Sequence, residues 1–504
     1  MLKLLAASFT SHLAATLSPI LFMDHTSDVT DIDGIVYEDV QSMQPAPSFT
    51  LPSAADSPLG TFQNGPSDFE LFGIVKCAPI NCTEVWRWVS ADLRAWGDGR
   101  SVFRADGRPW YPKSMARDES TKRDYVMLIF SDGSEDMTIN PTSVDYGWTA
   151  ASPHGLNFTF TKDTRDNNAP NFRDHDDANL LWHNGTYIDM QIAYEDHVKR
   201  FPDNAGGKRL RTVSARTCAA PGYPCRGWTE QLPSKRTPDA KLDPIDLEFY
   251  QLRPSVLGAS GRIVAAVLTY APTPLWLPYA DGYGMQPLHP SDCPHQKVSP
   301  AKEKRFGPFG CHGPHFGYEW WVAGPHGPLD LQGWARADRR QKATPANAQG
   351  GVVSPFAPAV TIGDQHVWLT GDGAYALPLY RVAGLRAHGN SAVSTWPFLM
   401  PIGASLWLNV RASWGAGRAP GSHASCDEAC NAYVAAELYD AATGEVLPGL
   451  TRDKCVLMDA DELRAPLEWK GANASALAGG KQVYVRFFFR EATIYAVGAG
   501  ARQM

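Results

Sequence analysis

Hydrophobic and polar residues alternate over short stretches along most of this chain. Four such stretches are YVMLIFS from Tyr125, TYIDMQIAY from Thr186, RIVAAVLTY from Arg262 and HVWLTGDG from His366. Alternation of this kind, or a short apolar run between turn residues, is typical of β-strands. Few stretches longer than about ten residues show the periodicity of an amphipathic helix. The pattern therefore predicts a mostly β protein.

A spacing of 62 residues recurs in the first part of the chain. It separates three pairs of residues: Ser90 and Ser152, Trp96 and Phe158, and Tyr125 and Tyr187. A third copy begins at Ser214, 62 residues after Ser152, and ends at Trp228 after a longer loop, and a fourth, looser copy, VAGPHGPLDLQGW, ends at Trp334. A repeat of about 60 residues with roughly four strands is the size of a β-propeller blade with long loops. Strands of a β-sandwich follow one another at shorter intervals and lack so long a period.

The repeat also predicts how the chain divides into domains. Four units end at Trp96, Phe158, Trp228 and Trp334, and a fifth runs from about Val352 to Arg386. We therefore expect a five-bladed β-propeller over residues 26–386. A sixth blade is the alternative, because the insertion 271–317 is long enough to hold extra strands. Closely spaced strands such as LWLNVRA and AYVAAELYD then predict a β-sandwich over residues 387–504. Its expected core includes Trp407, Trp469 and Phe488.

The composition favours one function class and argues against two others. The chain holds 16 Trp, 18 Tyr and 21 Phe, and aromatic rings suit a sugar-binding surface, although most Trp side chains are expected in the core. The net charge is −7 and no long run of one sign occurs, so we expect no nucleic-acid partner and no basic membrane face. No segment after the N-terminus is apolar over 18 residues, so no membrane-spanning helix is predicted. Nothing in the sequence indicates a cofactor or an oligomeric state.

The N-terminus, the cysteines and the sequons together favour secretion. Residues 1–25 are a candidate signal peptide. Nine cysteines include no C-x-x-C pair, so local disulfides are favoured over a zinc site. The expected pairs are Cys77–Cys82, Cys218–Cys225 and Cys293–Cys311, and Cys426 is left to pair with Cys430 or Cys455. Four N-glycosylation sequons begin at Asn81, Asn157, Asn184 and Asn473. We therefore expect a secreted glycoprotein.

Several short patterns resemble a known group of enzymes. DDANLLW followed by GTY resembles the opening of a blade in proteins labelled family-32-like, and LPGLTRDKC, LEWKG and VYVRFFFREATIYAV resemble their C-terminal sandwich. The chain is thus similar to the five-bladed propeller glycoside hydrolases of the family 32 and 43 type. This resemblance implies a carbohydrate substrate or ligand. The W-M-N-D-P-N-G, R-D-P and E-C patterns of family 32 are absent. The resemblance therefore supports the fold more than the reaction.

A second resemblance is to the Asp-box turn of sialidases. The stretch from Ser90 to Trp96 has the Ser-x-Asp-x-x-x-Trp form. Among the copies of the repeat, this first one alone has the acid, at Asp92. No arginine triad for a sialic acid carboxylate is evident. A sialidase is therefore the weaker alternative.

Acidic residues at the starts of inner strands are the candidate catalytic groups. Glycoside hydrolysis needs two carboxyl groups on either side of the anomeric carbon, and a third can tune the pKa of the proton donor. We expect Asp176 to act as base or nucleophile, Glu319 as acid and Glu248 as modulator, the last two being interchangeable. The alternative is that each acid pairs with backbone N–H groups or with an arginine, as Glu248 can with Arg253.

Four further residues are candidates for substrate binding: Asp177, His315, Trp320 and Trp321. Strand alternation allows one of the two tryptophans to border the pocket near Glu319 and places the other in the core. His315 belongs to an insertion that also carries His289, His295 and His312. This insertion is expected to be a disulfide-pinned loop over the channel mouth, because its spacing matches no strong metal pattern, and no metal is predicted.

Two functions remain open. The first is a secreted glycosidase that acts on a furanoside or a related glycan. The second is a carbohydrate-binding propeller without activity, in which the same acids hydrogen-bond sugar hydroxyls or hold Ca²⁺. The set of acids favours the enzyme, and the missing family 32 patterns favour the binding protein.

Overall fold

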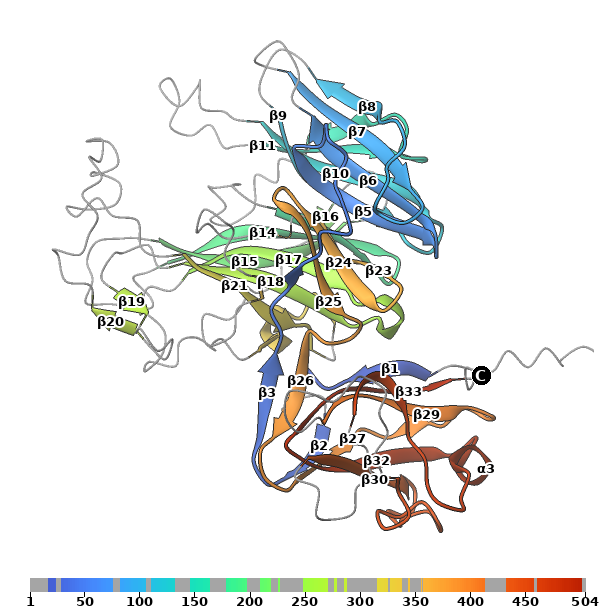
Figure 1. Cartoon of the computed structure of the whole chain (residues 1–504). Helices are drawn as coiled ribbons and strands as arrows, with labels where there is room; N and C mark the ends of the chain where they lie inside the picture. The colour runs from blue at the N-terminus through green and yellow to red at the C-terminus, as the bar shows by residue number, and fades with distance from the viewer. Residues whose placement is uncertain are drawn as a thin grey trace, which may run out of the picture. The chain divides into compact units, whose positions relative to one another are not determined.

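The structure is a computed structural model of the chain, and nearly all of its regular elements are β-strands (Figure 1). The all-β fold predicted from the sequence is confirmed. Among the described residues no helix is both apolar enough and long enough for a membrane span. The described residues are 17–23, 29–75, 82–105, 110–131, 146–163, 178–196, 209–218, 225–226, 248–270, 276–278, 285–287, 315–324, 327–337, 343–344, 355, 357–412, 432–456 and 460–500.

The chain forms two compact units. The larger comprises Gln41–Gly258 and Arg262–Leu377. The smaller comprises Met1–Val40, Ala259–Gly261 and Pro378–Met504. The observed division differs from the expected one, because the first 40 residues belong with the C-terminal sandwich and the boundary falls near residue 378.

Among the described residues the larger unit holds five four-stranded antiparallel sheets, here called blades 1 to 5. Blade 1 is β5 (Ser57–Gly65), β6 (Asp68–Val75), β7 (Thr83–Ser90) and β8 (Arg100–Ala105). Blade 2 is β9 (Trp110–Asp118), β10 (Arg123–Ser131), β11 (Tyr146–Ser152) and β12 (Thr159–Asp163). Blade 3 is β13 (Ala178–His183), β14 (Thr186–Asp196), β15 (Arg209–Cys218) and β16 (Cys225–Arg226).

Blades 4 and 5 depart from simple chain order. Blade 4 is β17 (Glu248–Val256), β18 (Ile263–Tyr270), β21 (His315–Val322) and β22 (Ala335–Arg336). A separate hairpin of β19 (Trp276–Pro278) and β20 (Met285–Pro287) lies in the expected insertion. Blade 5 is β23 (Val360–Ile362), β24 (Gln365–Thr370), β25 (Gly373–Pro378) and β4 (Gln44–Pro45).

Hydrogen bonds through the first strands link each blade to the next. They join Arg117 to the carbonyl oxygen of Gln63 (3.1 Å), Leu180 N–H to Ser114 Oγ (3.0 Å), Arg253 Nη1 to Asn179 Oδ1 (2.7 Å), Ala359 N–H to Ser255 Oγ (3.1 Å) and Thr361 N–H to Gln63 Oε1 (3.3 Å). These bonds connect blades 1 and 2, 2 and 3, 3 and 4, 4 and 5, and 5 and 1. The first strands therefore form a closed ring, as a β-propeller requires.

The N-terminal segment supplies the outer strand of blade 5. β4 pairs with β25 at Tyr375 and Ala376, and Ala46 N–H donates to the carbonyl oxygen of Ala374 over 2.9 Å. The fifth unit expected over residues 352–386 lacked this strand. Covering the edge of the last blade with a segment from the start of the chain removes an unpaired strand edge.

The 62-residue spacing matches equivalent places in neighbouring blades. Ser90 and Ser152 are the last residues of the third strands β7 and β11, and their hydroxyl oxygens accept hydrogen bonds from Leu93 N–H and Leu156 N–H. The aromatic residues Trp96, Phe158 and Trp334 lie between the third and fourth strands. The expectation that they end their units is wrong, because one further strand follows each of them.

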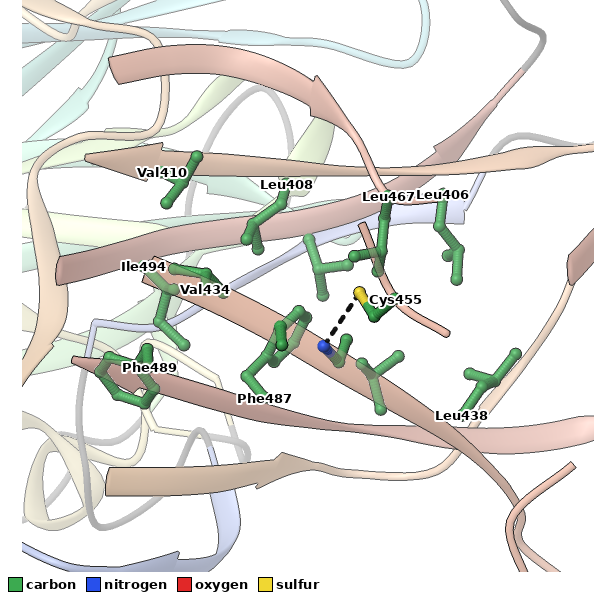
Figure 2. Packing of buried hydrophobic residues seen from close by; sticks show 14 of the residues in the cluster. Leu406, Leu408, Val410, Val434, Leu438, Cys455, Leu467, Phe487, Phe489 and Ile494 are labelled. Atoms are coloured by element: carbon green, nitrogen blue, oxygen red, sulfur yellow. Dashed lines mark hydrogen bonds between the residues drawn. The ribbon is translucent and has the colours of Figure 1, made fainter. Parts of the chain in front are cut away.

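The smaller unit is a β-sandwich. One sheet consists of β3 (Val36–Val40), β26 (Ala383–Ala387), β33 (Ala492–Gly500), β29 (Ser405–Arg411) and β31 (Asp461–Pro466), with β1 (Leu17–Leu21) on β33. The other consists of β2 (Val29–Asp33), β27 (Ser391–Thr395), β32 (Gln482–Arg490) and β28 (Phe398–Leu399), with β30 (Tyr433–Asp440) on β32. Leu408, Ile494, Val434 and Phe487 from the two sheets meet in one buried cluster (Figure 2).

Two details of the sandwich differ from expectation. β1 pairs with β33, and the ring of Phe22 meets that of Phe487 edge-on, with centroids 5.7 Å apart. The candidate signal peptide, residues 1–25, therefore overlaps the sandwich from Leu17 onward, and residues 1–16 lie outside the described ranges. Of the expected core residues, Trp469 is buried and Phe488 packs against the cluster, whereas Trp407 is half-buried and stacks on Tyr380.

Cys455 is a free thiol in the sandwich core. Its Sγ accepts a hydrogen bond from Ala436 N–H at 3.2 Å, shown as the dashed line in Figure 2. Burial raises the pKa of this thiol to about 12. The expected alternative of a Cys426–Cys455 bond is therefore wrong, and Cys426 and Cys430 lie outside the described residues.

The structure describes some cysteines of the expected local pairs and not others. Cys218 and Cys225 are direct register partners in β15 and β16. Cys82 is disulfide-bonded. Cys77, Cys293 and Cys311 lie outside the described residues, so the pairs that contain them stay predictions.

Candidate functional site

Three residues lie in one row across blade 4. Glu248 opens β17, and its register partner Tyr270 ends β18. Tyr270 is in turn the register partner of His315, which opens β21. In an antiparallel sheet the starts of the first and third strands and the end of the second share one end of the sheet. The row of Glu248, Tyr270 and His315, called the Glu248 row below, therefore marks one end of blade 4.

The entrance of blade 3 lies at the same end. Phe249, the second residue of β17, shares a buried cluster with Met190 and Val213. Met190 is the register partner of Asn179, the second residue of β13, and Asn179 Oδ1 accepts a hydrogen bond from Arg253 of β17 at 2.7 Å. Asp176 and Asp177 come directly before β13 in the sequence, and both lie outside the described residues.

Aromatic residues occupy the same end of three neighbouring blades. In blade 2, Trp110 and Tyr146 are both register partners of Ser131. In blade 3, Tyr194 lies near the end of β14, and in blade 4, Tyr270 ends β18. Sequence reasoning missed these residues as site candidates. The signal was present, because the apolar runs TYIDMQIAY and RIVAAVLTY both end in tyrosine.

Glu319 does not begin an inner strand, and that expectation is wrong. It lies within β21, the third strand of blade 4, with its side chain 3% exposed. Its Oε2 accepts a hydrogen bond from Arg336 Nε at 2.7 Å, and its Oε1 accepts one from Thr269 Oγ1 at 3.4 Å. The carboxylate thus neutralises a guanidinium between strands, which is the structural alternative considered for the acids.

The same arrangement recurs in two other blades. In blade 3, Asp189 Oδ2 accepts from Arg216 Nε at 2.8 Å. In blade 1, Glu70 accepts from Arg87, and also from Tyr125 Oη at 2.7 Å. Burial pushes the pKa of Glu70 upward, but the hydrogen bonds from Tyr125, Asn64 and Arg87 outweigh it, so the pKa is lowered. These acids hold their blades together and are not candidates for proton transfer.

Neither Trp320 nor Trp321 borders an open surface. They are 1% and 2% exposed, and they lie on opposite faces of β21. Trp321 packs edge-on against Phe249 with centroids 5.1 Å apart, and Trp320 packs against Trp368 with centroids 5.5 Å apart. The expectation that one of them contacts a ligand at the channel mouth is wrong, because both fill the spaces between blades.

The remaining candidates are placed in part. His315 is located by its register position in the Glu248 row, and His289, His295 and His312 lie outside the described residues. Arg253, proposed as a partner of Glu248, donates to Asn179. Within the described ranges no group of three or more His, Cys, Asp or Glu side chains is arranged to hold a metal ion.

Comparison with known proteins finds similarity in structure but not in sequence. No family model and no curated protein matches the chain. Similar solved structures include an exo-β-1,3-galactanase from Phanerochaete chrysosporium, with 11% identity, 92% of this chain and 100% of that chain covered, and a TM-score of 0.36. An exo-inulinase from Aspergillus awamori has 11% identity, coverage of 91% and 99%, and a TM-score of 0.35.

A third similar structure is a family 32 β-fructofuranosidase from Bombyx mori. It has 10% identity, coverage of 96% of this chain and 93% of that chain, and a TM-score of 0.35. All three are glycoside hydrolases.

Proposed function

We propose that this protein is a glycoside hydrolase that acts on a furanoside or a related glycan at the end of blades 3 and 4 marked by the Glu248 row. The observation that supports the proposal is that Glu248 is the first residue of β17, the first strand of blade 4, while Asp176 and Asp177 directly precede β13, the first strand of blade 3, in the sequence. Two carboxyl groups at one end of neighbouring blades are what hydrolysis of a glycosidic bond needs.

The ion pair between Glu319 and Arg336 supports a different assignment of roles to the acids. Asp176 keeps the role of base or nucleophile, and Asp177 that of a substrate ligand. Glu248 takes the role of general acid, because the exchange with Glu319 was open and Glu319 is tied to Arg336. Tyr270 and His315 share a register row with Glu248, and we assign them the roles of hydrogen-bonding sugar hydroxyls or orienting the carboxyl group.

A screen of hydrolysis tests this proposal. Aryl furanosides and plant or algal polysaccharides are incubated with the wild type and with Asp176→Asn. We expect turnover by the wild type and a loss of roughly 100- to 10,000-fold in the variant, the range for removing a group that acts on the reacting atoms. Binding of a glycan without turnover by either protein would overturn the hydrolase and favour the carbohydrate-binding alternative.

Secretion is part of the same proposal. Three of the four sequon asparagines, Asn157, Asn184 and Asn473, are in the described residues, and all three are exposed. Exposed sequons accept glycans when a chain passes through the secretory route. The proposal predicts a loss of mass on treatment of the natural protein with an N-glycosidase. An unchanged mass would count against secretion by that route. It would not affect the hydrolase proposal, which the screen of hydrolysis tests separately.

A further inference from the structure

The first strand of blade 2 exposes a tyrosine near its start. Tyr111 is the second residue of β9 and is 43% exposed. The second residues of the other first strands are Pro58, Asn179 and Phe249, which are buried, and Thr361, which is half-buried. The first strands of a propeller surround its axis and are enclosed by their neighbours. An exposed ring on one of them therefore marks a place where solvent reaches the inner part of the fold.

Tyr111 lies at the end of the blades where the first strands start. Tyr187, near the start of β14, donates a hydrogen bond from its Oη to the carbonyl oxygen of Asp124, near the start of β10. These two second strands therefore start at one end of blades 2 and 3. Because β9 and β13 are antiparallel to them, the starts of β9 and β13 share the opposite end. Asp176 and Asp177 directly precede β13 in the sequence.

A β-bulge follows Tyr111 directly. Pro112 and Ser114 are the register partners of two consecutive residues of β10, so Lys113 between them is an extra residue. A bulge bends its strand and changes the direction of the side chains beside it, and bulges are frequent next to active sites. Lys113 Nζ lies 5.9 Å from the centroid of the Tyr111 ring. The ammonium group and the ring therefore lie together, as a cation–π pair.

The chemistry of this pair suits a sugar unit. An aromatic face packs against the apolar C–H groups of a sugar ring, which removes apolar surface from water. The ammonium group of Lys113 has three N–H donors, and sugar hydroxyl oxygens accept hydrogen bonds. Small-molecule sites combine aromatic area with a few polar groups in this way.

We propose that Tyr111 and Lys113 form a glycan subsite that binds a sugar unit away from the reacting bond. This inference rests on the proposed function, because it places the reaction at the same end of the neighbouring blades. The proposed acids belong to blades 3 and 4, whereas the subsite belongs to blade 2. The sugar unit bound there is therefore a further unit of the chain, and the protein should prefer longer oligosaccharides.

Calorimetry and kinetics on the full-length protein test the inference. The probes are arabino-oligosaccharides and fructo-oligosaccharides of two to six units. We expect affinity to rise with length in at least one series, and Tyr111→Ala to weaken binding of its longest member by roughly 10-fold, in line with the burial of one aromatic face. For an oligosaccharide that is cleaved, the loss is expected in KM rather than in kcat, because a remote subsite binds substrate and transition state alike.

Three variants serve as controls. Tyr111→Phe keeps the ring and is expected to keep the affinity, which guards against a variant that fails to fold. Phe160→Ala removes a ring that is 41% exposed on β12, the outer strand of the same blade, and should leave the affinity for every length unchanged. Lys113→Met keeps the apolar stem without the donors and is expected to lose part of the affinity.

The inference and the hydrolase proposal can fail separately. An affinity that does not rise with length in either series, an absence of binding, or equal losses in Tyr111→Ala and Phe160→Ala would overturn the inference. Hydrolysis with equal affinity for all lengths would refute the inference and leave the hydrolase standing. Binding that rises with length and needs Tyr111, without hydrolysis, would support the inference and refute the hydrolase.

Discussion

At the scale of single residues, a buried ion pair between an acid and an arginine stabilises blade 4. Glu319 and Arg336 expose 3% and 13% of their side chains, and they neutralise each other inside the sheet. Removing one charge of such a pair leaves the other buried and uncompensated, which costs roughly 3 to 5 kcal/mol. Glu319→Gln is therefore expected to lower the free energy of unfolding by about that amount, measured in urea.

The same variant separates a structural role from a catalytic one. If Glu319 acts only within the sheet, the fraction of Glu319→Gln that is folded will keep the turnover number of the wild type. Full stability together with a large loss of turnover would show instead that Glu319 belongs to the catalytic machinery.

His366 gives blade 5 a dependence on pH. It is fully buried, its Nδ1 lies 3.1 Å from Thr361 Oγ1, and burial lowers its pKa from 6.5 to about 4. Between these two values the unfolded chain binds a proton that the folded chain does not, so stability falls as the pH falls from 6.5 toward 4. The loss amounts to roughly 3 kcal/mol by pH 4.

Unfolding experiments between pH 7 and pH 4 check this contribution. His366→Gln cannot take up this proton, so its stability is expected to depend less on pH than that of the wild type. Parallel curves for the two proteins would contradict a depressed pKa at His366.

At the scale of elements, alternation in the sequence was enough to find the strands but not their partners. TYIDMQIAY and RIVAAVLTY became β14 and β18, and the 62-residue spacing matched the third strands of successive blades. Glu319 was misplaced because the pattern does not say whether a strand is the first or the third of its blade. That order depends on pairings between distant segments.

The prediction for single elements concerns the short connection between β15 and β16. Cys218 and Cys225 are register partners, so their Cα atoms are about 4.5 to 5.5 Å apart, within the range that a disulfide spans. We expect a non-reduced peptide map to contain this pair. Closing so short a loop contributes roughly 2 to 3 kcal/mol, and Cys218→Ala should lower stability accordingly. Recovery of both cysteines as free thiols would refute the bond.

At the scale of the whole molecule, the N-terminal segment joins both units of the fold. It gives β1, β2 and β3 to the sandwich and β4 to blade 5. Sequence reasoning assigned these residues to a leader and to the propeller, because local patterns do not reveal pairing across several hundred residues. The proposed catalytic end was predictable only as a set of strand starts, and two of its residues, Asp176 and Asp177, lie outside the described residues.

Phe22 tests the role of that segment in the sandwich. It is fully buried and packs on Phe487. Phe22→Ala is expected to cost about 3 to 5 kcal/mol, as for other large-to-small changes in a core. Thermal unfolding checks this, with the exposed Tyr37→Ala as a control that should change little. An unchanged midpoint for Phe22→Ala would mean that the sandwich folds without its first strand.

The central claim is that the end of the blades marked by Glu248 carries out glycoside hydrolysis. Its most direct test is the turnover number of Glu248→Gln on a glycan that the wild type cleaves, together with the dissociation constant for that glycan. We expect Glu248→Gln to lose turnover by roughly 100-fold or more and to keep a dissociation constant within about 2-fold of the wild type, because the amide keeps the shape of the acid but cannot donate its proton. Wild-type turnover by Glu248→Gln would contradict it.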